Sequence, residues 1–416
     1  MTQSTNGVTL RLRAKGRVEF TDDDADVRSL SPGGRFTVER STGRFFGESQ
    51  RFEVRAAGDG TLSRTYTKNG STLDPAEGRK WLATFLPGLL RDMGVNANKR
   101  VARHLSQGGP AAVLDLVDRI TTSQGKGAHL RELYRQAALD PAALARSLEG
   151  AARGIESDFE MAQVLTAAAE RQPVDAAMQA WVRAAGTIGS DFEQRRVVSA
   201  ALARPGLTPA EAAATLGAAT PGAGRDGIRS DFELAEVLIG APPGVIASAP
   251  DAWFDAIGTI QSAFERRRAL TAAVARESAQ LTPRVLEAAQ GIGSDFERAE
   301  LLVTVLRSGN VAESAMPQLA AAVRGVRSDF ERARVLKAAA RASLTDAGLA
   351  QVIVTAGEIR SDFESAEALI ALARSPAVGP EARKALAAAA ERIGSRHERG
   401  RVLSELVRVG VLTASE

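Results

Sequence analysis

The side chains of this chain that could do chemistry are mostly charged, and arginine stands out among them. Arginines form two runs, at Arg195-Arg196 and at Arg266 to Arg268, and a further arginine, Arg225, precedes Asp226 in a Gly-rich loop. Guanidinium groups bind carboxylates and phosphates through paired hydrogen bonds. The candidate ligand-binding residues are therefore Arg195, Arg196, Arg225, Asp226, Arg267 and Arg268.

Each candidate also has a structural interpretation, which the sequence leaves open. An arginine can lay its stem over apolar neighbours or form a salt bridge between repeats. Arg225 and Asp226 lie in the extra residues of one long repeat, and an insertion of this kind is either a functional loop or a plain flexible one.

Residues that would support catalysis or metal binding are missing from the sequence. There is no cysteine, and His104, His129 and His397 do not fall in a metal-ligand spacing. No nucleophile, phosphate-loop or dinucleotide-binding motif occurs. We therefore expect no enzyme activity, no cofactor and no metal, and we expect the histidines to be surface or capping residues.

A repeated motif organises the chain from residue 157 onward. Eight serines begin it, and their spacings of 33, 40, 32, 32, 34, 33 and 34 residues indicate a helical-repeat array. Two copies are altered, Ser262-Ala-Phe-Glu and Ser395-Arg-His-Glu. The six full copies are Ser157, Asp158, Phe159, Glu160; Ser190, Asp191, Phe192, Glu193; Ser230, Asp231, Phe232, Glu233; Ser294, Asp295, Phe296, Glu297; Ser328, Asp329, Phe330, Glu331; and Ser361, Asp362, Phe363, Glu364.

The motif is explained by helix formation. Ser followed three residues later by Glu predicts a capping box, and the intervening Asp places negative charge at the positive end of the helix. Phe159 with Ala162, Val164 and Leu165 predicts a buried face, so we expect the phenylalanines to pack in the core. An acidic ladder that binds cations or a basic peptide is the functional alternative.

A second, more variable helix follows each first helix. Glycine often ends it, as at Gly186, Gly258, Gly325 and Gly357, which predicts left-handed helix caps. The predicted fold is mainly α: a right-handed α-solenoid of about 33-residue helix-turn-helix repeats.

The N-terminal region has a different pattern. Segments 8–13, 17–20, 35–40, 51–55 and 61–67 alternate with period two between turn-forming residues, which predicts a small antiparallel β domain. The predicted domains are a β domain at 1–73, degenerate capping repeats at 74–156 and regular repeats at 157–416.

Charge and hydropathy limit the partners and the compartment. Residues 96–416 hold 38 Lys/Arg and 38 Asp/Glu, so the repeat region is neutral, which disfavours nucleic acid. No apolar stretch is long enough to span a bilayer. We expect a cytoplasmic location as the sequence stands, or a periplasmic, envelope-facing one if a signal peptide was removed.

Residues 75–412 resemble α-solenoids of HEAT-like helical pairs. More narrowly, Ile-x-Ser-Asp-Phe-Glu repeats behind a β region resemble uncharacterised bacterial proteins. They are also similar to segments attached to antibiotic-sensor-type membrane metallopeptidases. The zinc motif of that family is absent here, so the resemblance implies a bacterial source but no peptidase activity.

These observations predict a non-enzymatic scaffold that binds a protein or peptide in the groove of a repeat array. Specificity is expected on the variable second helices. Two alternatives remain: a HEAT-like protein that binds nucleic acid or processes DNA bases, and a structural spacer or self-assembly module. The identity of the partner and the oligomeric state are not predicted.

Overall fold

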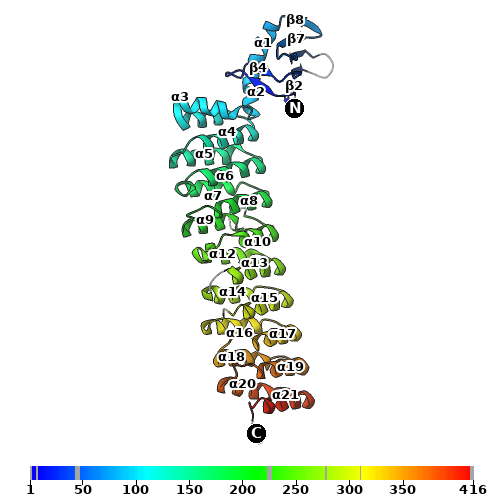
Figure 1. Ribbon diagram of the computed structural model, residues 1–416, viewed down its shortest axis with the longest axis vertical. Helices are drawn as coiled ribbons and strands as arrows, with labels where there is room; N and C mark the ends of the chain where they lie inside the picture. The colour runs from blue at the N-terminus through cyan, green and yellow to red at the C-terminus, as the bar shows by residue number, and fades with distance from the viewer. Residues whose placement is uncertain are drawn as a thin grey trace. The chain divides into compact units, whose positions relative to one another are not determined.

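The structure is a computed structural model, which describes residues 2–5, 8–42, 47–222, 227–276, 279–309 and 311–412. It is mainly helical with an N-terminal antiparallel β-sheet, as predicted, and the chain forms two compact units, Met1–Ala167 and Ala168–Glu416 (Figure 1).

The first unit begins with eight strands. Six of them form an antiparallel sheet in the order β1-β2-β5-β6-β7-β8, and β3 pairs with β4. The strands are β1 Thr2–Thr5, β2 Val8–Lys15, β3 Val18–Phe20, β4 Val27–Leu30, β5 Arg35–Thr42, β6 Ser49–Ala56, β7 Leu62–Lys68 and β8 Ser71–Leu73.

One face of the sheet is apolar and buried. Phe36, Val38, Phe52 and Val54 are fully buried, and they form one core cluster with residues of β3, β4 and the first two helices, among them Leu82. The helices that complete this unit are α1 Pro75–Ala83, α2 Leu86–Asp92, α3 Ala97–Asp118, α4 Ser123–Gln136, α5 Pro141–Gly154 and the start of α6, Asp158–Arg171.

Helix α3 is in effect two helices. Gly108 and Gly109 depart from helical geometry, with φ of −157° and 65°, and Pro110 follows them. The Gly-Gly-Pro segment therefore acts as the helix connector that its composition predicts.

The second unit alternates two kinds of helix. We call those that begin in the repeated motif first helices, namely α8 Asp191–Leu202, α10 Asp231–Gly240, α13 Ala263–Arg276, α15 Asp295–Ser308, α17 Asp329–Ala339, α19 Asp362–Ala373 and α21 Arg396–Arg408. The second helices are α7 Met178–Ala185, α9 Pro209–Ala219, α12 Pro250–Thr259, α14 Thr282–Ala289, α16 Met316–Arg324, α18 Asp346–Ala356 and α20 Pro380–Ala390. Short pieces precede four of them, namely η1 Val174–Ala177, α11 Val245–Ser248, η2 Ala279–Leu281 and η3 Glu313–Ala315.

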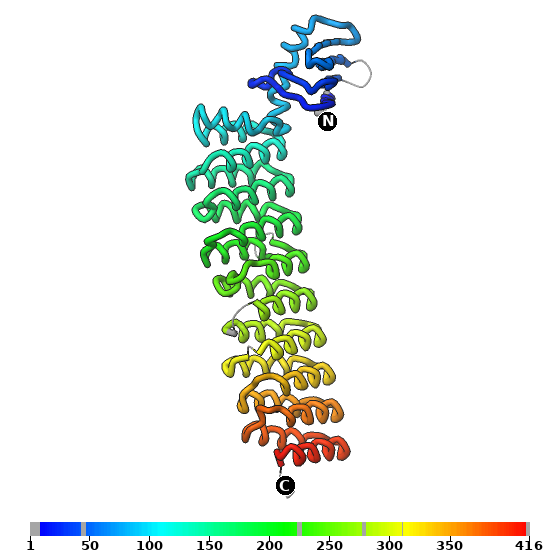
Figure 2. Tube along the Cα trace, viewed as in Figure 1, coloured from blue at the N-terminus to red at the C-terminus, as the bar shows by residue number. Residues whose placement is uncertain are grey.

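These helices form two layers within the second unit. Each first helix packs against the next first helix, and each second helix packs against the next second helix. Figure 1 and the trace in Figure 2 show the two rows side by side. Leu270, Leu302, Leu336 and Leu369 of the first helices are fully buried in the continuous core of this unit.

The predicted left-handed glycine caps are wrong. Gly186, Gly325 and Gly357 have φ of −68°, −65° and −70°, which is right-handed helical geometry. At Gly325 a Cβ atom would lie only 2.5 Å from Nη1 of Arg298, so a larger residue there would displace that guanidinium. None of the helices in the described ranges has the length and apolar character needed to cross a membrane.

Candidate functional site: the aromatic face of the first helices

The serine half of the predicted capping box is confirmed. In all seven first helices of the second unit, the serine Oγ accepts a hydrogen bond from the backbone N–H of the motif Glu at 3.3 to 3.4 Å, and Ser157 does the same in the first unit. This satisfies one free donor at the start of each helix.

The glutamate half of the capping box is wrong, because in five of the seven first helices the serine N–H donates to another partner. The N–H of Ser230 donates to Asp191 of the preceding first helix at 2.8 Å, and the N–H of Ser262 donates to Asp231 at 2.6 Å. The same bond joins Ser328 to Asp295, Ser361 to Asp329 and Ser395 to Asp362. The motif Asp therefore ties the starts of successive first helices together.

The motif glutamates bind arginines instead. Arg195 pairs with Glu233 and Arg267 with Glu297, and in both cases the glutamate belongs to the next first helix. Arg196 and Arg268 pair with the motif Glu of their own helix at 2.7 and 2.5 Å. Thus Arg195 and Arg267 form salt bridges between repeats, which is the structural interpretation that the sequence offered for these arginines. The other two candidates, Arg225 and Asp226, lie outside the described residues.

The expectation that the motif phenylalanines are buried is wrong. The six rings of the second unit that the motif supplies are 49 to 61% exposed, and Phe159 of the first unit is 54% exposed; the six are Phe192, Phe232, Phe264, Phe296, Phe330 and Phe363. With 3.6 residues per turn, the position two after the serine lies about 140° from the buried position seven after it. The rings therefore stand on the outward side of the layer.

Arginine guanidinium groups cover several of these rings. Arg195 lies 5.1 Å from the centroid of Phe192, and Arg267 lies 5.2 Å from that of Phe264. Arg334 lies 5.3 Å from Phe296, a ring of the preceding first helix. Distances within about 6 Å indicate cation–π attraction. We call the six rings with these arginines and the motif glutamates the aromatic face.

A charge alternation runs along the aromatic face six residues after each motif serine. Going from α8 to α21, this position holds Arg196, Glu236, Arg268, Glu300, Arg334, Glu367 and Arg401. Three ion pairs join neighbours in this series, Arg268 with Glu236, Arg334 with Glu300, and Arg401 with Glu367. The alternation is visible in the sequence once the repeats are aligned on their serines, and the sequence analysis missed it.

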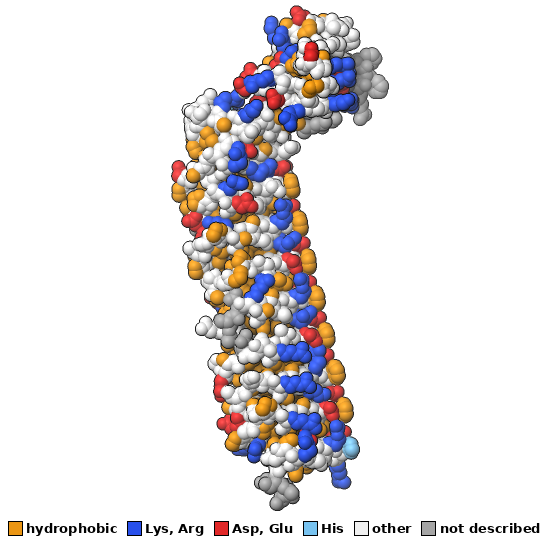
Figure 3. Space-filling model, in the orientation of Figure 1, with side chains coloured by type: hydrophobic (Ala, Val, Ile, Leu, Met, Phe, Trp, Pro, Cys, Tyr) orange, Lys and Arg blue, Asp and Glu red, His pale blue; other side chains and the backbone are white. Residues whose placement is uncertain are grey.

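The starts of the first helices are acidic on balance. The six residues that follow the serine in α8, α10, α13, α15, α17 and α19 include fourteen Asp/Glu and eight Arg. Three of those arginines, at 266, 298 and 332, donate to backbone carbonyls and lie partly or fully buried. Figure 3 shows Lys and Arg side chains following one another beside hydrophobic ones over α15 to α21.

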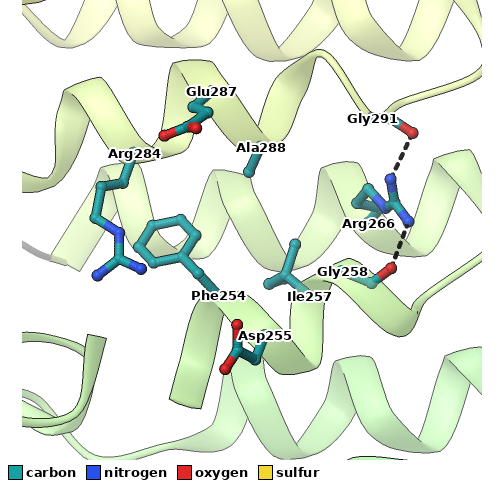
Figure 4. A pocket seen from close by; sticks show the side chains of 9 residues that line it. All are labelled: Phe254, Asp255, Ile257, Gly258, Arg266, Arg284, Glu287, Ala288 and Gly291. Carbon is teal, nitrogen blue, oxygen red and sulfur yellow. Dashed lines mark hydrogen bonds between the residues drawn. The ribbon is translucent and has the colours of Figure 1, made fainter. Parts of the chain in front are cut away.

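The second helices, where specificity was expected, carry a hollow of about 320 Å³ between α12 and α14. Figure 4 shows Phe254 and Ile257 of α12 opposite Ala288 of α14, with Arg284 at one end and Arg266 at the other. Arg284 lies 4.5 Å from the Phe254 centroid and bonds Asp251 at 2.7 Å. In this hollow, Arg284, Phe254 and Asp251 form the same combination of arginine, phenylalanine and acid that occurs on the aromatic face.

One histidine departs from its expected surface position. His129 of α4 is fully buried, and its Nε2 lies 2.9 Å from Nη1 of Arg100, which binds Asp24 at 2.6 Å. Since an arginine only donates, Nε2 is the acceptor, and Nδ1 donates to the Gly125 carbonyl at 2.7 Å. Burial, with help from the nearby Arg100 charge, lowers the pKa of His129 to about 4, so the ring is neutral at pH 7.

Across the described residues, no group of three or more His, Asp or Glu side chains is arranged to hold a metal ion. The sequence matches no protein-family model, no curated protein and no solved structure. The inference of function therefore depends on the surface chemistry of the chain itself.

Proposed function

We propose that this chain is a HEAT-like, right-handed α-solenoid that acts as a non-enzymatic scaffold and binds an extended protein segment along the aromatic face. One observation carries the proposal: six phenylalanines, one per repeat, stay about half exposed on the same side of one helix layer. An exposed aromatic ring at the same position of six successive repeats indicates a binding role for this surface.

The chemistry of the aromatic face suggests what the segment contains. Half-exposed rings bind apolar side chains, and a row with one ring per repeat suits a segment with apolar side chains at regular intervals. The excess of acidic residues at the starts of the first helices favours Lys and Arg in the segment, and the rings already accept guanidinium groups from the chain itself. We therefore propose a partner segment in which apolar and basic residues alternate.

Nucleic acid is the second candidate, and the exposed rings give it more support than the sequence did. Aromatic side chains can serve as stacking platforms for bases, and arginines can add contacts to phosphates. The acidic excess around the rings argues against it, because phosphate binding needs uncompensated cations. Self-assembly through the aromatic face is the third candidate.

Synthetic peptides can test the proposal. Fluorescence anisotropy of an alternating Leu-Arg peptide, an alternating Leu-Glu peptide and a single-stranded oligonucleotide would be measured with the full chain. We expect the Leu-Arg peptide to bind most tightly. The triple variant Phe264→Ala, Phe296→Ala, Phe330→Ala should weaken that binding at least about tenfold, since a buried aromatic contact contributes about 1–3 kcal/mol.

The control removes the same kind of surface elsewhere. Val354, Leu403 and Val407 are exposed apolar residues outside the aromatic face, at 43, 38 and 42% exposure, and their triple alanine variant should bind like the wild type. Unchanged binding in the phenylalanine variant, or tighter binding of the oligonucleotide, would contradict the proposal. Concentration-dependent self-association that the phenylalanine variant abolishes would favour self-assembly.

A further inference from the structure

The polar face of the N-terminal sheet carries a cluster of positive charge. In the antiparallel register, Arg11 lies opposite Glu39, Arg13 opposite Thr37 and Lys15 opposite Arg35. On the next strand, Glu39 pairs with Arg51, Thr37 with Glu53 and Arg35 with Arg55. The six cations of this face on β2, β5 and β6 are Arg11, Arg13, Lys15, Arg35, Arg51 and Arg55, and we call them the basic sheet face.

All six cations are solvent-exposed, and only two acidic residues on the same strands face them. Glu53 is buried beneath the arginines, and it binds Arg51 at 2.5 Å, Arg55, and Arg35 at 3.6 Å. Glu39 binds Arg51 at 3.2 Å. Burial opposes ionisation of Glu53, but the hydrogen bonds from Arg55 and Arg51 outweigh it and lower its pKa.

The cations of β2 are not neutralised. No ion pair of Arg11, Arg13 or Lys15 is formed within the described residues. They occupy alternate positions of one strand, so they project from the same side at intervals of about 7 Å. Six cations against two anions leave an excess of four positive charges on the basic sheet face.

The opposite face of the sheet cannot serve as the contact surface. It is covered by β3, β4 and α1 and contributes Phe36, Phe52 and Tyr66 to the core. The basic sheet face has only hydroxyls beside its charges on β7, at Ser63, Thr65 and Thr67. In the described part of the sheet, every aromatic side chain lies on the covered side or within the core.

We propose that the basic sheet face docks on the surface of an anionic phospholipid membrane. The cations are spread over three neighbouring strands, so they match a plane of headgroups better than a line of phosphates. Arginine forks and threonine hydroxyls suit phosphate and carboxylate oxygens. Each cation near an anionic leaflet adds to binding, and the effect is screened by salt.

Nucleic acid fits the basic sheet face less well. Sequence reading requires an element that enters a groove, and a broad sheet face does not supply one. Binding of single strands relies on stacking against aromatic rings, which the described residues of this face do not offer. Duplex binding through phosphates alone is the remaining competitor.

Vesicle co-sedimentation with the full chain tests the proposal. Vesicles of phosphatidylcholine would be compared with vesicles that contain about one third phosphatidylserine, at low and high salt. We expect binding only to the anionic vesicles, with loss at high salt. The variant Arg11→Gln, Arg13→Gln, Lys15→Gln should reduce partitioning at least about tenfold, because three charges leave the contact surface.

The matched control changes the net charge equally. Arg383, Lys384 and Arg392 are exposed residues on or just after α20, and their triple Gln variant should bind vesicles like the wild type. Equal losses in both variants, or no loss in the β2 variant, would overturn the proposal. Tighter binding to a short DNA duplex than to the vesicles, lost in the β2 variant, would overturn it in favour of nucleic acid. The peptide assay does not involve this face, so the two proposals can fail separately.

Discussion

At the scale of single residues, the motif aspartate has the clearest role. It accepts the serine N–H of the next repeat, and often the preceding N–H as well, as Asp362 does from Ser395 at 2.8 Å and Gly394 at 3.0 Å. Two first helices of the second unit lack it: α13, where Ala263 stands in place of Asp, and α21, where Arg396 does. Helix α13 also has the Arg266 to Arg268 run. Arg267 binds Glu297 of the next first helix, and Arg266 donates to the carbonyl of Gly291, just before that helix.

Restoring the missing aspartate should stabilise the chain. Ala263→Asp would give the N–H groups of Gly293 and Ser294 an acceptor, and we expect a gain of about 1 kcal/mol in the free energy of unfolding. Chemical denaturation would measure this gain as a higher midpoint concentration of denaturant, with an unchanged dependence of the unfolding free energy on denaturant. Asp295→Ala, which removes the acceptor of Ser328, should lose a similar amount.

The control for this prediction is Ala263→Ser, whose hydroxyl is too short to bridge to the next repeat. A gain from serine as large as that from aspartate would show that the bridging bond is not the cause.

Contacts within one motif could be predicted from the sequence, whereas contacts between repeats could not. Serine capping depends only on residues three apart in the chain, so Ser190 and Glu193 could be read directly. The hydrogen-bond partner of Asp191 and the ion-pair partner of Glu233 lie one repeat away. Only the packing of the repeats determines which backbone N–H or arginine binds each carboxylate. The exposure of Phe192 follows from its angular position, because the ring lies about 140° around the helix from the buried Val197 although it is only three residues from Arg195.

At the scale of elements, the residue four positions after the motif serine joins successive second helices in several repeats. Gln194, Arg266, Arg298 and Arg332 do so through hydrogen bonds to backbone carbonyls. Arg332 is 8% exposed and donates to the carbonyls of Val326 at 2.9 Å, Arg324 at 3.0 Å and Glu358 at 3.2 Å. These carbonyls lie at the ends of α16 and α18. One guanidinium therefore satisfies the termini of two second helices.

Removing this guanidinium should cost more than removing a surface arginine. Arg332→Met keeps the stem but leaves three carbonyls without their donor, and we expect a loss of about 2–3 kcal/mol in unfolding free energy. Arg332→Lys should lose less unfolding free energy than Arg332→Met but should still be less stable than the wild type, since an ammonium lacks the planar fork of a guanidinium. Thermal and chemical unfolding would measure both variants.

The neighbouring Arg327 is exposed, and Arg327→Met serves as the control with little expected change. If both methionine variants unfold alike, the helix-joining role of Arg332 is wrong.

At the scale of the whole molecule, we expect the two units to differ in their response to acid. The buried pair of Arg100 and Asp24, with His129 at its end, lies in the first unit and joins a strand connection to α3 and α4. His129 has a folded pKa near 4 and an ordinary value of 6.5, so the unfolded chain binds its proton first as the pH falls. The contribution of neutral His129 to the free energy of unfolding is therefore fully present above about pH 6.5 and is lost as the pH falls toward 4.

We therefore expect the first unit to lose up to about 3 kcal/mol between pH 6.5 and pH 4, from a shift of about 2.5 pH units at 1.36 kcal/mol each. Hydrogen exchange followed by mass spectrometry would show amides of α3 and α4 losing protection, while those of α15 and α17 keep theirs. His129→Gln should remove the pH dependence in this range. Equal loss of protection in both units would contradict the assignment.

The general architecture was predictable from the sequence, and the surfaces were not. The repeat period and the period-two alternation can be read from the chain alone. The first predicts the helices and the second predicts the antiparallel sheet, and the structure has both. The basic sheet face depends on the register that sets Arg51 across from Glu39, which no local pattern fixes. The predicted domain boundary at residue 157 stays a prediction, and the compact units divide after Ala167.

The alternation of Arg and Glu along the aromatic face has a consequence for how such a chain can grow. Duplicating a single repeat within α8 to α21 would place two arginines or two glutamates next to each other at the sixth position, which repel. Duplicating two repeats together would reproduce the Arg268–Glu236 arrangement at every new junction. Adding or removing repeats in pairs should therefore preserve the ion pairs between neighbouring first helices, whereas adding or removing a single repeat should not.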